Sequence, residues 1–130
     1  MNIKAIHHVA IICSNYQVSK KFYSEILGFK ILQETYRKER DSYKLDLQVA
    51  HSGSQIELFS FPNPPPRVSR PEAQGLRHLA FSVSDIEKEV STLNAKGIST
   101  EPIRVDEITG KRFTFFADPD GLPLELYEVV

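Results

Sequence analysis

The sequence predicts an α+β fold made of two paired βαβββ modules. The first observation is an internal repeat, in which residues 6–28 (IHHVAIICSNYQVSKKFYSEILG) align with residues 76–97 (LRHLAFSVSDIEKEVSTLNAKG). The second is that each half ends in a similar strand-like run, SQIELFSF at 54–61 and LPLELYEV at 122–129. Two halves that agree in the order of their elements indicate a repeated supersecondary unit.

The first half begins with an apolar, strand-like run around His8 and continues into an amphipathic helix. The apolar residues of this helix recur at helical spacing: Val18, Phe22, Tyr23, Ile26 and Leu27. Gly28 supplies the left-handed residue that commonly ends a helix. Three strands are expected to follow, at residues 29–36, 44–50 and 55–61.

The second half repeats this order. Ser84 and Glu87 have the spacing of a capping box, and Gly97 is expected to end the helix that follows. The apolar stripe of this helix consists of Ile86, Val90 and Leu93. The expected strands lie at residues 99–105, 112–117 and 123–128, with DPDG at 118–121 as the turn between the last two.

The two modules are expected to form a single domain over residues 1–130. The first module spans residues 1–61, a Pro-rich connector spans 62–75, and the second module spans 76–130. Five prolines in the connector disfavour a helix or a central strand. The connector either links the modules or also covers a binding site, and both interpretations are open.

The charge, the length of the apolar runs and the cysteine content of the chain argue against some classes of partner. The chain has 16 Lys and Arg against 17 Asp and Glu, and its net charge of −1 argues against nucleic acid. No apolar run approaches the roughly 20 residues that span a bilayer, and the N-terminal run is too short for a signal peptide. The single cysteine, Cys13, cannot form an internal disulfide, so we expect a cytoplasmic protein. We also expect a homodimer, because small modules leave exposed sheet edges.

Four strands each carry one His or Glu on the face opposite their apolar residues. His8 precedes Glu57 by 49 residues, and His78 precedes Glu125 by 47. Because side chains alternate along a strand, these four residues are expected on one face of each sheet. Taken singly, each is better interpreted as a structural His or a solvent-facing Glu. Their symmetric placement favours a site for Zn, Ni, Co, Mn or Fe(II), which two imidazoles and two carboxylates suit better than Ca or Mg.

Several motifs together resemble the vicinal oxygen chelate superfamily, and within it glyoxalase I and its bacterial relatives. These are HHVAI, FYSEILGF, QIELF, GLRHLAFSV and DPDGLPLELYE, and the resemblance covers residues 6–128. It implies that the paired modules form a cupped mixed sheet around one divalent metal ion, with Ni or Zn expected before Co, Mn or Fe. Carried over position by position, the ligands would be His8, Glu57, His78 and Glu125.

The resemblance also implies a reaction. It would be that of a metal-dependent lyase or isomerase, similar to lactoylglutathione lyase, acting on a small hemithioacetal or related oxygenated substrate through an enediolate. Glu125, or as second choice Glu57, would leave the metal and move a proton between adjacent carbons. The alternatives are an epimerase, a thiol transferase or a dioxygenase of the same superfamily, or a small-molecule-binding protein without catalysis.

The substrate is expected to differ from that of glutathione-using glyoxalases. Those enzymes commonly have an Arg four residues after the first ligand and an Asn four residues after the second, where this chain has Ile12 and Phe61. Without these polar contacts, glutathione should bind weakly. Basic residues in loops are the candidates for substrate contacts, although each is also typical of a solvated surface: Arg67, Arg70, Lys111 and Arg112.

Overall fold

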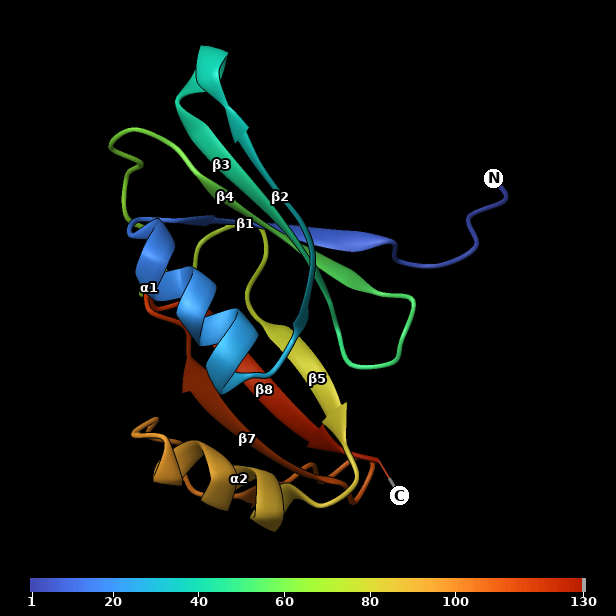
Figure 1. Ribbon diagram of the computed structural model, residues 1–130. Coiled ribbons are helices and arrows are strands. Elements are labelled where there is room, and N and C mark those ends of the chain that lie inside the picture. Colours follow the sequence, from blue (N-terminus) through green and yellow to red (C-terminus); the bar gives the residue numbers. More distant parts are fainter. Residues whose placement is uncertain (130) are drawn as a thin grey trace. The chain divides into compact units, whose positions relative to one another are not determined.

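The computed structural model describes residues 1–129 and confirms the α+β class (Figure 1). The chain divides into two compact units, Met1–Pro66 and a second that begins at Arg67. Each unit contains one four-stranded mixed sheet. The interpretation of both modules as one domain stays a prediction, and residue 130, the last of the predicted second module, lies outside the described residues.

The first module contains one helix and four strands. Its elements are β1 (His8–Cys13), α1 (Tyr16–Lys21), a π-helical turn (Phe22–Ile26), β2 (Lys30–Arg37), a 3₁₀ turn (Lys38–Arg40), β3 (Ser42–Gln48) and β4 (Gln55–Ser60). Asn15 caps α1 by accepting a hydrogen bond from the Val18 N–H, and Gly28 at φ +74° ends the helical segment. The strand order is β1-β4-β3-β2, with β1 parallel to β4 and the other neighbours antiparallel.

The second module repeats this topology. Its elements are β5 (Leu79–Val83), α2 (Ile86–Ala95), β6 (Arg104–Val105), β7 (Arg112–Ala117) and β8 (Pro123–Glu128). The strand order is β5-β8-β7-β6, with β5 parallel to β8. Each strand therefore occupies the same place as its counterpart in the first module, which confirms the predicted repeat.

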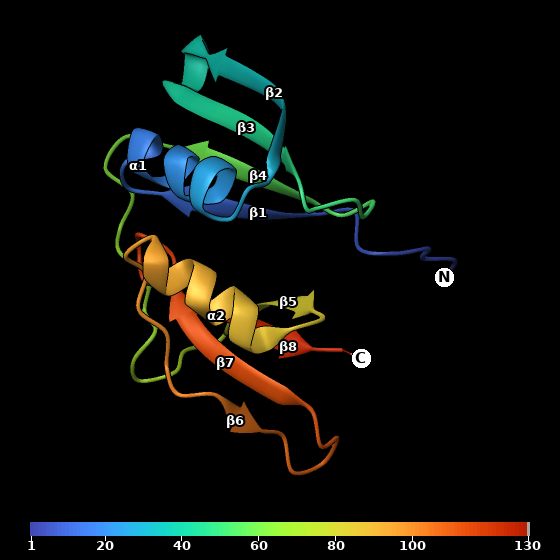
Figure 2. The same ribbon diagram turned by 60° about the horizontal axis from the view of Figure 1, so that its bottom comes forward.

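One face of each sheet packs against the helix of its own module (Figure 2). Helix α1 contacts β4, and α2 contacts β8. Along β1, Ile11 and Cys13 are buried, whereas His8, Ala10 and Ile12 are exposed. This burial follows the predicted alternation: Ile11 and Cys13 belong to the core under the helix, and His8 lies on the other face, together with the apolar Ala10 and Ile12.

The turn between β7 and β8 fixes where the last strand begins. Oδ1 of Asp118 accepts hydrogen bonds from the N–H groups of Asp120 and Leu122, both at 2.9 Å. Gly121 adopts φ +80°, a conformation that costs glycine little and other residues more. The DPDG turn is therefore confirmed, and it positions the segment that carries Glu125.

Two predicted elements are wrong in detail. The strand expected at 99–105 is reduced to β6, because Pro102 has no N–H to donate and the preceding residues make only irregular bonds to β7. One of these is from the Glu101 N–H to the Phe115 carbonyl, at 2.8 Å.

The N-terminal cap of α2 is Asp85 and not Ser84, since the Asp85 carboxylate accepts a hydrogen bond from the Lys88 N–H at 3.1 Å. No helix within residues 1–129 is long and apolar enough to cross a membrane.

Candidate metal centre

The first module brings His8 and Glu57 together. Their strands, β1 and β4, are parallel neighbours in which Ala10 lies opposite Glu57. His8 Nδ1 is 3.4 Å from Glu57 Oε2, and the two side chains are 40% and 14% exposed. The ring of His7 meets His8 edge-on, and the two Nδ1 atoms lie 2.9 Å apart. The pair is thus accessible at the imidazole and mostly covered at the carboxylate.

The second module brings His78 and Glu125 together in the same way. Ala80 on β5 lies opposite Glu125 on the parallel strand β8, which is the register of Ala10 and Glu57. His78 Nε2 is 3.0 Å from Glu125 Oε2, with the side chains 28% and 11% exposed. Each predicted imidazole therefore contacts the predicted carboxylate of its own module.

The two pairs have different neighbours. Glu57 lies opposite Asp46, and Lys44 Nζ lies 3.7 Å from Glu57 Oε1 and 3.2 Å from Asp46 Oδ1. The position opposite Glu125 is taken by Phe115, whose ring meets the His78 ring edge-on at 5.1 Å. The first carboxylate thus has a cation beside it, whereas the second lies beside an aromatic ring.

The geometry of each pair is suitable for binding a metal ion. Two donor atoms bound to one cation at about 2.1 Å, with an angle between about 90° and 110°, are roughly 3.0–3.4 Å apart. The N–O distances of 3.4 Å and 3.0 Å fall in this range. Within residues 1–129, neither module gathers three His, Cys, Asp or Glu side chains that could hold a metal ion. A four-ligand site therefore needs both pairs.

The four basic residues predicted to contact substrate from loops have different surroundings, and one of them, Arg112, is the first residue of β7. Arg67 donates to the hydroxyl of Ser69 at 2.6 Å and to the carbonyl of Leu76 at 3.1 Å. Arg70 Nη1 lies 3.9 Å from Glu72 Oε1, and Lys111 is half-buried. The contacts of Arg67 hold the connector against the start of β5. A role of any of these residues in substrate binding stays a prediction.

Arg112, the fourth of these residues, is held by carboxylates of its own module. Its Nε and Nη2 donate to Glu128 at 2.7 Å and 2.8 Å, and Nη1 lies 3.2 Å from Glu87 Oε1. Glu128 Oε1 also accepts a hydrogen bond from the N–H of Ile86, at the start of α2, at 3.1 Å. Arg112 therefore links β7, β8 and α2, and a contact with substrate would compete with these bonds.

Replacing Glu128 with Gln is expected to lower thermal stability at neutral pH. The hydrogen bonds from Arg112, and next the one from the Ile86 N–H, hold the pKa of the Glu128 carboxyl below its usual value. The ionised carboxylate therefore stabilises the folded chain above the usual pKa of about 4.3. This contribution is lost as the pH falls through the lowered pKa of the folded state.

Melting temperatures measured by circular dichroism over a pH series test this expectation. The difference between the wild-type chain and Glu128→Gln should be largest near neutral pH and should shrink in acid. A difference that stays constant across the series would contradict it.

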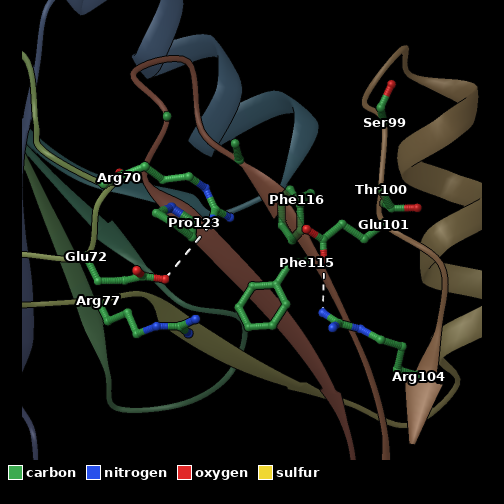
Figure 3. Close-up of a pocket in the computed structure, with 13 residues that line it drawn as sticks. Arg70, Glu72, Arg77, Ser99, Thr100, Glu101, Arg104, Phe115, Phe116 and Pro123 are labelled. Atoms are coloured by element: carbon green, nitrogen blue, oxygen red, sulfur yellow. Dashed lines mark hydrogen bonds and ion pairs between the residues drawn. The ribbon is translucent and has the colours of Figure 1, made fainter.

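A cavity of about 580 Å³ lies in the second module (Figure 3). Arg77 and Arg104 place their guanidinium groups on either side of the Phe115 ring, and Pro123 adds to the apolar wall. The sequence interpretation missed both arginines. Arg77 precedes β5, so strand alternation did not place it, and Arg104 was assigned to a longer strand than the one that forms. Its position directly before His78 was the available signal for Arg77.

Ile12 and Phe61, the two residues that depart from the pattern of glutathione-using enzymes, have apolar side chains with different surroundings. Ile12 is 55% exposed on the same face of β1 as His8. Phe61 stacks on Phe59 at 6.0 Å, and the guanidinium carbons of Arg37 and Arg40 lie 5.6 Å and 5.0 Å from the Phe61 ring centre. An aromatic ring flanked by cations thus occupies the place where glutathione-using enzymes commonly have an amide.

The two repeated sheets, each with one His–Glu contact, define a class of protein built from two βαβββ modules. The family model described as the Glyoxalase/Bleomycin resistance protein/Dioxygenase superfamily matches residues 5–126. The chain belongs to this superfamily, which is the vicinal oxygen chelate superfamily that its motifs resemble. Its members bind small molecules, usually hold a divalent metal ion and often form dimers.

Several proteins match nearly the whole chain. "Uncharacterized protein YwkD" of Bacillus subtilis (strain 168) is 66% identical, over 98% of this chain and 99% of that protein. "Uncharacterized protein YaeR" of Escherichia coli (strain K12) is 59% identical, over 98% of both. The solved structure of the glyoxalase family protein from Enterococcus faecalis is 55% identical with a TM-score of 0.90, and covers 98% of this chain and 100% of that one.

More distant relatives have names that describe different activities. A "2-epi-5-epi-valiolone epimerase" of Actinomyces sp is 27% identical, over 94% of this chain and 78% of that protein. The fosfomycin resistance protein FosX of Listeria monocytogenes is 19% identical with a TM-score of 0.76, covers 97% of this chain and 94% of that one, and shares the fold alone. Membership of the superfamily therefore establishes the fold but not the reaction.

Proposed function

We propose that this chain is a metal-dependent, glyoxalase I-like lyase or isomerase. Its substrate would be a small hemithioacetal or a related compound with oxygens on neighbouring carbons. The observation that carries this proposal is the pair of repeat-related contacts, His8 with Glu57 and His78 with Glu125, at donor separations suitable for one cation. A solvated surface would not need both contacts in the same register of two sheets.

His8, Glu57, His78 and Glu125 would hold the metal ion, one pair from each module. Two nitrogen and two oxygen donors fit Ni or Zn, with Co, Mn or Fe as further candidates. When bound, the ion would stabilise negative charge that develops on substrate oxygens. For either pair, the other module of the same chain or the corresponding module of a second copy would complete the site. We also propose that the chain forms a homodimer and that it works in the cytoplasm.

Glu125 is our first choice for the base that moves the proton. Each carboxylate has a histidine beside it, but Glu57 also has Lys44, which favours keeping that carboxylate in place. Glu125 has His78 and Phe115 beside it, and Phe115 lines the cavity of its module. A carboxylate next to a cavity can reach a proton on a bound substrate, which is the geometric requirement for a general base.

Glutathione is a weak candidate for the thiol. Ile12 and Phe61 present no polar group where a glutathione-using enzyme commonly has Arg and Asn. Loss of a charge-assisted donor costs affinity for a substrate carboxylate. We therefore propose a small substrate or a thiol adduct other than that of glutathione.

The direct test is hemithioacetal isomerisation by protein reconstituted with Ni or Zn. Methylglyoxal would be supplied with glutathione and, separately, with smaller thiols, while metal content is measured on the same samples. We expect about one metal ion per site and faster turnover with a smaller thiol. A chain that binds no metal would contradict the proposal, and fast turnover with glutathione would contradict the substrate part of it.

The second candidate is an epimerase, favoured by the relative whose name describes that activity. Epimerisation also removes a proton from a carbon and returns one, so the same carboxylates would serve. Incubation of candidate substrates in D₂O distinguishes the two, because an epimerase introduces deuterium and inverts one centre without forming a new functional group.

A further inference from the structure

We propose that the cavity of the second module binds a carboxylate group of the substrate, with Arg77 as its main ligand and Arg104 beside it. This inference deepens the proposed function and rests on it for the identity of the reacting site. Its residues are other than the four metal-ligand candidates, and two of them, Arg77 and Phe115, contact His78. The cavity, of about 580 Å³, is large enough for a small organic acid.

The cavity lies on the same face of the sheet as Glu125. Phe115 on β7 is directly opposite Glu125 on β8, and side chains of directly opposite residues lie on one face. Ala117 and Pro123 form the next opposite pair on this face, and both line the cavity. A molecule in the cavity would therefore contact the Phe115 ring, which also touches His78.

The charges around the cavity leave one arginine without a carboxylate partner. Arg104 pairs with Glu101 at 2.9 Å, and Arg70 Nη1 lies 3.9 Å from Glu72. Among residues 1–129, the contact of the Arg77 guanidinium is with the ring of His78, Nη1 to Nδ1 at 3.0 Å, and no carboxylate is paired with it. The lining thus has one net positive charge, which matches one carboxylate better than a doubly charged phosphate.

Arg104 is positioned to assist Arg77 in attracting a carboxylate to the cavity. Its guanidinium carbon lies 5.0 Å from the centre of the Phe113 ring and 6.0 Å from that of Phe115, so aromatic faces hold it along β7. Figure 3 shows Arg77 and Arg104 flanking Phe115. A carboxylate bound to Arg77 would meet the forked donors that guanidinium groups offer to carboxylates, and Arg104 would add a second positive charge on the other side of the ring.

The remaining lining restricts the rest of the substrate. Phe115, Ala117 and Pro123 present hydrocarbon, whereas Ser69, Ser99 and Thr100 present hydroxyl groups, so the lining favours a short carbon skeleton that carries oxygens. The substrate class is therefore a small carboxylic acid whose oxygen-bearing carbons lie toward the His78–Glu125 pair. A hemithioacetal formed from a small thiol that itself carries a carboxylate belongs to this class.

The test is an NMR titration of the full-length chain with lactate, with lactamide as its neutral analogue and with inorganic phosphate. Metal-loaded and metal-free samples are both titrated, since lactate can also bind a metal ion directly. We expect lactate to shift the Arg77 and Arg104 side-chain signals in both samples and to bind more tightly than lactamide and phosphate. Arg77→Gln should weaken lactate binding about 10-fold or more, and Arg77→Lys should restore part of it.

The matched control is Lys88→Gln, which removes one positive charge from exposed α2 of the same module and should leave lactate binding unchanged. Equal binding of lactate and lactamide, equal effects of Arg77→Gln and Lys88→Gln, or tighter binding of phosphate would each overturn the proposal. Failure of the proposed function looks different: the chain would bind no Ni or Zn, while metal-free protein would still bind lactate through Arg77.

Discussion

Replacing Glu125 with Gln is expected to lower kcat of the metal-loaded protein by a factor on the order of 10²–10⁴, the usual contribution of a general base. Gln keeps the size of the side chain and one oxygen donor, so metal binding should survive better than catalysis. Steady-state rates and metal content, measured on the same preparation, separate the two effects.

Glu57→Gln is the matched control, because Glu57 has the same place in the other module. It should reduce kcat less, since the Glu57 carboxylate is paired with Lys44 and is proposed to stay on the metal. A larger loss in Glu57→Gln would reassign the base to the first module. Unchanged turnover in Glu125→Gln with metal bound would rule out Glu125 as the base. If the wild-type chain itself shows no turnover and Glu125→Gln leaves its affinity for ligand unchanged, the result would favour a binding protein.

His8→Ala and His78→Ala are each expected to weaken metal binding by more than about 100-fold. Even partners that only orient a metal ligand are worth about 10–100-fold, and these changes remove a ligand itself. The proposal requires both modules, so either change alone should be sufficient. Competition with a chelator, followed by metal analysis, measures the affinity.

His51→Ala is the control for these variants, because His51 is exposed in the loop between β3 and β4 and should not affect metal content. The informative comparison is between the metal affinities of His8→Ala and His78→Ala. If one of them keeps full affinity, the metal belongs to a single module and the four-ligand arrangement is wrong.

Much of the fold, and the sheet face on which each His and Glu lies, followed from two simple periodicities. Helical spacing and glycine stops located α1 and α2, and strand alternation put His8 and Glu57 on the face away from the core. The repeat then predicted the counterpart residues of the second module. These rules apply because a buried face imposes one pattern along a whole element.

The remaining features depend on contacts that no periodicity encodes. Asp85 caps α2 in place of Ser84 because the actual helix start is one residue later, which a motif of several polar residues does not determine. Arg77 and Arg104 reach the cavity from a loop and from a two-residue strand, where alternation does not hold. The different neighbours of Glu57 and Glu125, Lys44 and Phe115, depend on the pairing of strands that are distant in sequence.

The unequal surroundings of the two carboxylates have a stereochemical consequence. In the proposed four-ligand site, two carboxylates of equal reactivity could each deliver a proton, and a planar carbon between them could receive it on either face. With a cation beside Glu57 and an aromatic ring beside Glu125, the two carboxylates do not serve equally, because the cation favours keeping Glu57 in place. Delivery of the proton from one carboxylate then favours one face of that carbon, so a reaction at this site would yield one enantiomer in excess.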